Sequence, residues 1–105
     1  MADEQCITLD LNNPAFQDTL FALQKQERLA VLDTLKKLRQ LTWPQLYADK
    51  GLRWEKIASV KPPQGVPALY SLRITQACRA TAFRDGNILH FLTIHTDHDA
   101  TYGKK

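Results

Sequence analysis

The sequence has no apolar run that approaches the length of a membrane-spanning helix, which needs about 20 apolar residues. Its first six residues, MADEQC, form no apolar signal core, so we expect no export signal and a cytoplasmic protein. Internal repeats and low-complexity segments are also absent. With 105 residues the chain is long enough for one modest core, and we expect residues 1–105 to form a single domain.

Cysteine is scarce, and acidic residues are scarce in the second half. Cys6 and Cys78 form no CxxC pair, so we expect two reduced thiols buried as small hydrophobic residues. Residues 1–49 carry five lysines and arginines against seven acidic residues, whereas residues 50–105 carry nine against four. The corresponding net charges are −2 and +5. The C-terminal half is therefore the better candidate for contact with a polyanion, although an ordinary solvated basic surface has the same charge.

The first half of the chain has the periodicity of helices. After ITLDL (7–11), which alternates as a strand does, Asn13 and Pro14 provide a cap and a first helical residue for a helix that reaches about Gln24. The segment ERLAVLDTLKKLRQL (27–41) predicts a second helix with a buried leucine stripe. That stripe consists of Leu29, Leu32, Leu35 and Leu38, widened by Val31 and Leu41.

The second half changes to the period of strands. TWPQLYADKG (42–51) predicts a short helical turn, and LRWEKI (52–57) a strand or an extended connector before the loop KPPQGVP (61–67). Strands are then predicted at ALYSLRIT (68–75), CRATAFRD (78–85) and ILHFLTIH (88–95), with a tight turn at DGN. We therefore expect an α+β fold: an N-terminal strand, two helices, then a three- to four-stranded antiparallel sheet with helices on one face.

Alternation along the predicted strands separates the two faces of the sheet. Arg79 points to one face and Arg84 to the other, because they are an odd number of residues apart. Arg73 lies on the more polar side of the preceding strand. In the last strand both alternating sets contain apolar residues, so the pattern does not assign a face to His95.

The segment HTDHDATY (95–102) concentrates titratable side chains at the end of the last strand. A metal site could use His95, His98 and Asp99, but their spacing matches no structural zinc pattern, so we expect no metal and no cofactor. A solvated polar tail is a second interpretation. The third is acid–base chemistry on a phosphodiester, because histidine exchanges protons near neutral pH and arginines can stabilise the developing charge.

The run LYSLRITQACRATAFRDGNILHFLTIHTDHDATY (69–102) resembles the C-terminal part of the RelE/ParE superfamily of bacterial toxins. The matching features are, in order, Leu72-Arg73, Arg79 with Phe83, Asp85-Gly86, the ILHFLTI strand and a polar tail through Tyr102. The predicted order of strand, helices and antiparallel meander fits the same superfamily. The resemblance implies a RelE-like fold for most of the chain.

The resemblance also implies a function. The ribosome-dependent ribonucleases of this superfamily cut messenger RNA at the ribosomal A site, and a cognate antitoxin neutralises them. By position, Arg79 resembles the arginine that contacts phosphate, His95 and His98 lie where a general acid is found, and Tyr102 resembles the C-terminal tyrosine that stacks on or activates the nucleotide. We assign further RNA or phosphate contacts to Arg73, Arg84, Lys104 and Lys105.

The chain also departs from the family pattern. It lacks the lysine pair that several RelE-type enzymes carry, and the histidines fit the HigB and YoeB branches better. The ParE branch inhibits DNA gyrase and cleaves nothing, so a non-catalytic ParE-like toxin or a degenerate binding module is the alternative. We expect a metal-independent endoribonuclease that acts on ribosome and messenger RNA and has a cognate antitoxin as its partner.

Overall fold

The computed structural model describes residues 5–59 and 61–96. The elements are β1 (Thr8–Asp10), α1 (Pro14–Ala22), α2 (Lys25–Leu38), α3 (Trp43–Ala48), β2 (Glu55–Ile57), β3 (Leu69–Thr75), β4 (Cys78–Asp85) and β5 (Ile88–Thr96). The α+β prediction is confirmed. The sheet has five strands rather than three or four, because β1 and β2 join its two edges.

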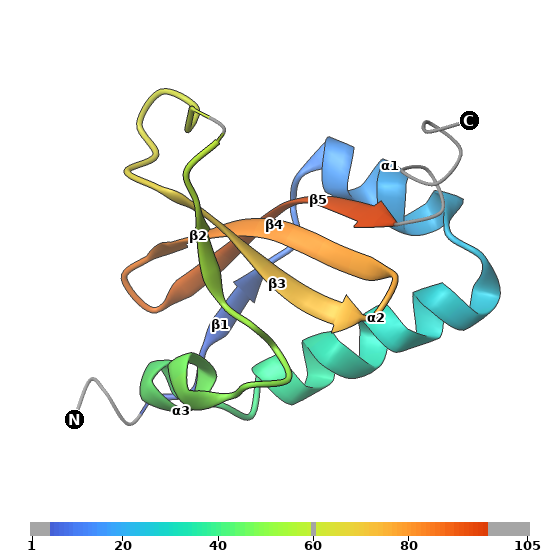
Figure 1. The fold of residues 1–105 in the computed structure, drawn as a ribbon, viewed down its shortest axis with the longest axis horizontal. Coiled ribbons are helices and arrows are strands. Elements are labelled where there is room, and N and C mark those ends of the chain that lie inside the picture. The colour runs from blue at the N-terminus through green and yellow to red at the C-terminus, as the bar shows by residue number, and fades with distance from the viewer. Residues whose placement is uncertain (1–4, 60, 97–105) are drawn as a thin grey trace.

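One sheet organises the fold, in the strand order β1-β5-β4-β3-β2 (Figure 1). Strands β2 to β5 form an antiparallel meander, whereas β1 pairs in parallel with β5. The β4–β5 hairpin turns at Gly86, whose φ of 61° is a conformation that glycine adopts without strain. The turn predicted at DGN is thereby confirmed.

Helices α1 and α3 each begin directly after a residue whose side chain caps them. The side chain of Asn13 accepts the N–H groups of Ala15 and Phe16 at the start of α1. Thr42 and Gln45 form a reciprocal capping box at the start of α3. Within residues 5–59 and 61–96, no helix is long and apolar enough to cross a membrane.

All three helices contribute to a core on one face of the sheet. Phe16 of α1 packs against Phe91 of β5, with the ring centroids 5.3 Å apart. The other core residues from helices are Val31, Leu35, Leu38, Trp43 and Leu46, and those from the three long strands are Leu72, Cys78, Ala80, Ala82, Leu89 and Ile94. Burial of these apolar side chains is the main source of stability. The opposite face of the sheet carries exposed polar residues, including Arg79 and His95.

The leucine stripe predicted for α2 is only half correct. Leu35 and Leu38 are buried, but Leu29 and Leu32 are 51% and 52% exposed. The helix buries Val31, Leu35 and Leu38 instead, and at about 100° per residue Leu29 and Leu32 lie roughly 150° and 90° away from the centre of that stripe. The prediction that both thiols are buried is also only half correct, since Cys78 is buried but Cys6, which precedes the edge strand, is exposed.

Edge strand β1 is tied to the sheet by a polar pair as well as by its backbone. The carboxylate of Asp10 lies 2.7 Å from Nδ1 of His90, and the His90 ring stacks on Phe83 with centroids 4.6 Å apart. Asp10 also accepts the backbone N–H of Asn12 at 2.9 Å. These hydrogen bonds lower the pKa of the Asp10 carboxyl. The bond from the Asn12 N–H has the largest effect, followed by the bond with His90.

We predict that Asp10→Asn lowers the free energy of unfolding by about 1 kcal/mol near neutral pH, because a charge-assisted hydrogen bond at a partly exposed site is lost. Since folding lowers the pKa of Asp10, its stabilising effect is fully present above the unfolded-state pKa of about 4 and is lost as the pH falls below it, through the lower pKa of the folded state. Urea denaturation should therefore show the wild type and the variant converging below about pH 4. The exposed α2 residue Asp33 serves as the control, and an equal effect of Asp33→Asn would contradict the assignment.

Candidate functional site

A row of basic side chains crosses the open face of the sheet. Arg73 on β3 pairs directly with Arg79 on β4, and Arg79 pairs directly with His95 on β5. Directly opposed residues in neighbouring strands point to the same face of a sheet. The register therefore brings together three of the residues that the sequence analysis selected.

A β-bulge decides the face of His95. Thr81 pairs with Thr93, but the next residue, Ala82, pairs with Phe91, so Leu92 is an extra residue in β5. A bulge of one residue reverses the alternation on either side of it. For this reason simple alternation did not assign His95 to a face, although the structure places it beside Arg79.

A second row, of hydroxyl groups, lies next to the first. Ser71, Thr81 and Thr93 oppose one another across β3, β4 and β5. The Thr93 hydroxyl lies 2.8 Å from Nε2 of His95 and forms a hydrogen bond with it. Thr93 and His95 are two residues apart on the same strand, and their hydrogen bond orients the imidazole on the open face.

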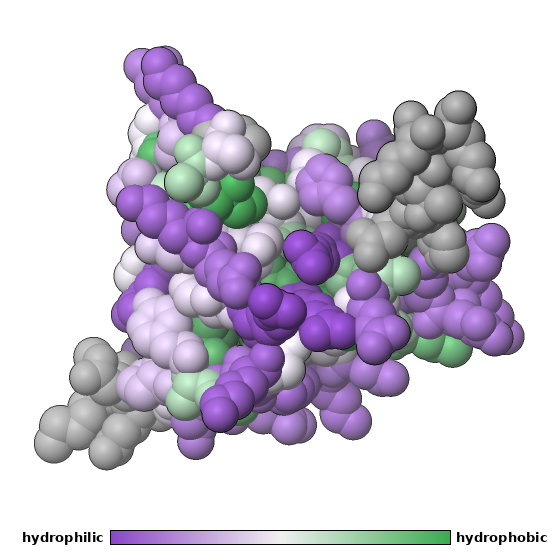
Figure 2. Space-filling view, in the orientation of Figure 1, coloured by the Kyte–Doolittle hydropathy of each residue, from purple (hydrophilic) through white to green (hydrophobic). Residues whose placement is uncertain are grey.

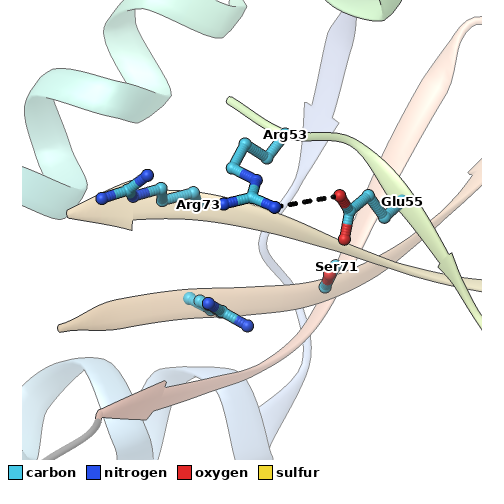
Figure 3. A pocket seen from close by; sticks show the side chains of 5 residues that line it. Arg53, Glu55, Ser71 and Arg73 are labelled. Carbon is cyan, nitrogen blue, oxygen red and sulfur yellow. Dashed lines mark hydrogen bonds and ion pairs between the residues drawn. The ribbon is translucent and has the colours of Figure 1, made fainter. Parts of the chain in front are cut away.

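A small hollow, with a cavity volume of about 10 Å³, adjoins the basic row (Figure 3). It is lined by Arg53, Glu55, Ser71, Arg73 and Arg79. Glu55 opposes Ser71 in the β2–β3 pairing, and its carboxylate lies 3.5 Å from the guanidinium of Arg53. Glu55 is thus the carboxylate among the residues that line the hollow, and it pairs with Arg53.

The charge of the hollow suits an anion. Three guanidinium groups against one carboxylate leave a formal charge of +2. Guanidinium groups bind phosphate oxygens through paired, charge-assisted hydrogen bonds. The most hydrophilic side chains of the face in view gather over β3 and β4 (Figure 2). A phosphate group is therefore the ligand that this geometry favours.

Arg84 is not part of this arrangement. Its guanidinium lies 4.3 Å from the centroid of a Trp43 ring, and Nη1 donates a hydrogen bond to the Tyr47 hydroxyl at 2.7 Å. Nε donates to the carbonyl oxygen of Gly86 at 2.8 Å. The side chain thus packs against α3, on the other side of the sheet from Arg79. The geometry gives Arg84 a role in holding α3 to the β4–β5 hairpin.

Several of the predicted site residues lie outside the described part of the chain: His98, Tyr102, Lys104 and Lys105. Their roles stay predictions. Among residues 5–59 and 61–96, no group of three histidine, cysteine or acidic side chains could hold a metal ion. Two of the three ligands considered for a metal, His98 and Asp99, are not among those residues.

Sequence reasoning missed two lining residues, Arg53 and Glu55. They stand two positions apart in LRWEKI, on either side of Trp54, and this alternation was a usable signal for a strand with one charged side. What the sequence did not reveal is the partner of that strand. Pairing of β2 with β3 is a long-range contact, and it alone brings Glu55 to the arginines.

Comparison with solved structures identifies the fold. The chain is similar to a chain of the crystal structure of the archaeal RelE–RelB complex from Pyrococcus horikoshii OT3, with a TM-score of 0.60 and 13% sequence identity. The match covers 87% of this chain and 94% of that chain. The chain has a RelE-like fold. At this identity the likeness establishes the fold alone.

The RelE-like fold was the one expected from the sequence, but other comparisons add little to it. A copper-bound mutant toxin from Helicobacter pylori also matches, at 14% identity over 89% of this chain and 94% of that chain. Its TM-score is 0.45. No family model and no curated protein matches the sequence. The assignment to the HigB-like branch therefore stays a prediction.

Proposed function

We propose that this chain is the toxin of a type II toxin–antitoxin system and acts as a ribosome-dependent endoribonuclease on messenger RNA. The observation that carries the proposal is the cross-strand row of Arg73, Arg79 and His95 beside a cationic hollow. It lies on the sheet face opposite the helices of a RelE-like fold. A fold alone does not determine an activity, so the proposal depends on this site.

The arginines supply phosphate binding and charge stabilisation. Arg79 stands at the centre of the row, between Arg73 on one side and His95 on the other. A phosphodiester above Arg79 could accept hydrogen bonds from two guanidinium groups. Such donors stabilise the additional negative charge that a phosphate acquires when a nucleophile attacks it.

The acid–base residues follow from the chemistry of RNA cleavage. When the 2′-hydroxyl oxygen attacks phosphorus, its proton passes to a base, and the departing 5′-oxygen takes a proton from an acid as the P–O5′ bond breaks. We assign the base to Glu55 and the acid to His95, with His98 and Tyr102 as further candidates. Three strand spacings and an offset of two residues along the strands separate Glu55 from His95, so their backbones are roughly 16 Å apart, with Arg79 on the strand next to His95.

The form of the site supports a substrate that is presented by a larger particle. The hollow is small, and its three arginines suit the phosphate backbone, whose contacts carry no sequence information of their own. Contacts of this kind give weak sequence preference and strong dependence on salt. A ribosome that holds a single-stranded message would supply the positioning that the toxin surface lacks.

A partner protein is supported by the outer surface of the helices. Phe21, Leu29 and Leu32 are 69%, 51% and 52% exposed and, together with Leu20, line an open groove along α1 and α2. Lys25 and Arg28 also line this groove. An amphipathic antitoxin segment with acidic flanks matches both its apolar floor and its cationic rim. Exposed apolar side chains of this size indicate an interaction surface.

The catalytic proposal is tested by cleavage of messenger RNA on translating ribosomes. Arg79→Ala and His95→Ala should each lower the cleavage rate at least roughly 100-fold, the scale of lost charge stabilisation or general acid catalysis. Lys36→Ala, which removes the same charge from the outer side of α2, should leave the rate unchanged. His98→Ala and Tyr102→Ala complete the series. Full activity in both Arg79→Ala and His95→Ala, or growth arrest with DNA damage signalling and intact message, would contradict the proposal.

The antitoxin surface is tested by expressing additional toxin in the source organism. The organism's own antitoxin should neutralise the additional wild-type toxin, so that growth continues. The double substitution Leu29→Glu and Leu32→Glu should abolish neutralisation and arrest growth, because two carboxylates would enter the apolar groove. Gln40→Glu, a charge change elsewhere on the helix side, should remain tolerated. The surface assignment would be wrong if the double variant cleaved message normally in vitro but was neutralised like the wild type.

A further inference from the structure

Arg53 has an unusual backbone conformation at the edge of the hollow. Its φ is 49°, and among residues 5–59 and 61–96 it is the one residue other than glycine with a positive φ. For an L-amino acid other than glycine this region costs about 1 kcal/mol or more, because Cβ approaches the backbone closely. Such strain persists where surrounding contacts impose it, and it is concentrated at functional sites.

The neighbours of Arg53 impose this conformation. Leu52 is buried, its N–H donates to the Asp49 carboxylate at 3.0 Å, and its carbonyl oxygen accepts the N–H of Arg73 at 2.6 Å. On the other side, the Trp54 ring stacks on Tyr70 with centroids 4.5 Å apart and planes 11° apart. Both flanking residues are thus fixed to the body of the protein, and the chain between them must take the strained turn.

The side chain of Arg53 makes only a weak interaction with the described part of the protein. In the described structure its polar partner is Glu55, at 3.5 Å, and the two side chains are 52% and 59% exposed. An exposed ion pair of this length contributes little to stability. The same guanidinium lines the hollow with Arg73 and Arg79, where a phosphate could bind more strongly than the Glu55 carboxylate does.

We infer that Arg53 is a third phosphate ligand of the site, held toward the hollow by its left-handed backbone at a cost in stability. This inference rests on the proposed function and names the substrate group that Arg53 contacts: a phosphodiester of single-stranded RNA next to the one above Arg79. When this phosphate binds, it replaces Glu55 as the partner of Arg53. The Glu55 carboxylate is then available to accept a proton.

The test separates stability from binding in the variant Arg53→Gly. Glycine relieves the backbone strain, so the equilibrium constant for unfolding in urea should fall by up to about fivefold or stay unchanged. Binding of a dye-labelled single-stranded RNA, measured by fluorescence anisotropy over a series of NaCl concentrations, should weaken. The slope of log affinity against log salt should decrease in magnitude by about 0.7, the value for one lost phosphate contact. Arg53→Lys keeps the positive charge, so it should have the wild-type slope but bind the RNA several-fold more weakly than the wild type does.

The control is Arg39→Ala, which removes one positive charge outside the hollow and should leave the slope unchanged. The inference is overturned if Arg53→Gly binds RNA with the wild-type slope, whatever its stability, or if the wild type binds no polyanion. Failure of the proposed function looks different. In that case wild-type protein would leave translated message intact, while Arg53→Gly would still lose one phosphate contact with RNA.

Discussion

The site depends on the pairing register of β3, β4 and β5. Apolar packing fixes that register: Leu72, Ala80 and Ile94 lie in one cross-strand row that faces the helices and is almost wholly buried. A slip of one residue would turn this row outward and carry Arg79 into the core, at a cost of several buried side chains. The positions of Arg73, Arg79 and His95 on the open face therefore follow from the hydrophobic core on the other side. The core thus determines which side chains form the site, although it lies on the opposite face of the sheet.

The two short elements, α3 and β2, complete the hollow through aromatic contacts. Trp54 stacks on Tyr70 and lies 5.8 Å from Trp43, and Arg84 packs over the Trp43 ring. These contacts hold β2 against β3 although the strand has only three residues. The two arginines of β4 thus differ in role, since Arg84 packs against α3 on one face of the sheet and Arg79 lines the hollow on the other.

The elements of the fold could be predicted because their signals are local. Capping residues, the Asp85-Gly86-Asn87 turn and the change of period at the proline-rich loop all lie within a few residues of the element they specify. The features that the sequence did not predict depend on contacts between residues far apart in the chain or on irregular strand pairing. The face to which His95 points depends on a bulge at Leu92, and no residue type in the sequence predicts that bulge. The position of Glu55 depends on the pairing of β2 with β3. The leucine stripe of α2 was too wide because the sheet buries only one side of it, leaving Leu29 and Leu32 for another partner.

The central claim, that RNA phosphate binds across the open face of the sheet, is tested most directly by residue-resolved NMR. Single-stranded RNA titrated into ¹⁵N-labelled protein at low salt should shift the backbone amide signals of Ser71, Arg79, Thr81 and His95. The amides along the outer side of α2, including Leu29 and Leu32, should stay unchanged. Shifts confined to α1 and α2, or no shifts at a concentration that gives binding by another method, would contradict the claim.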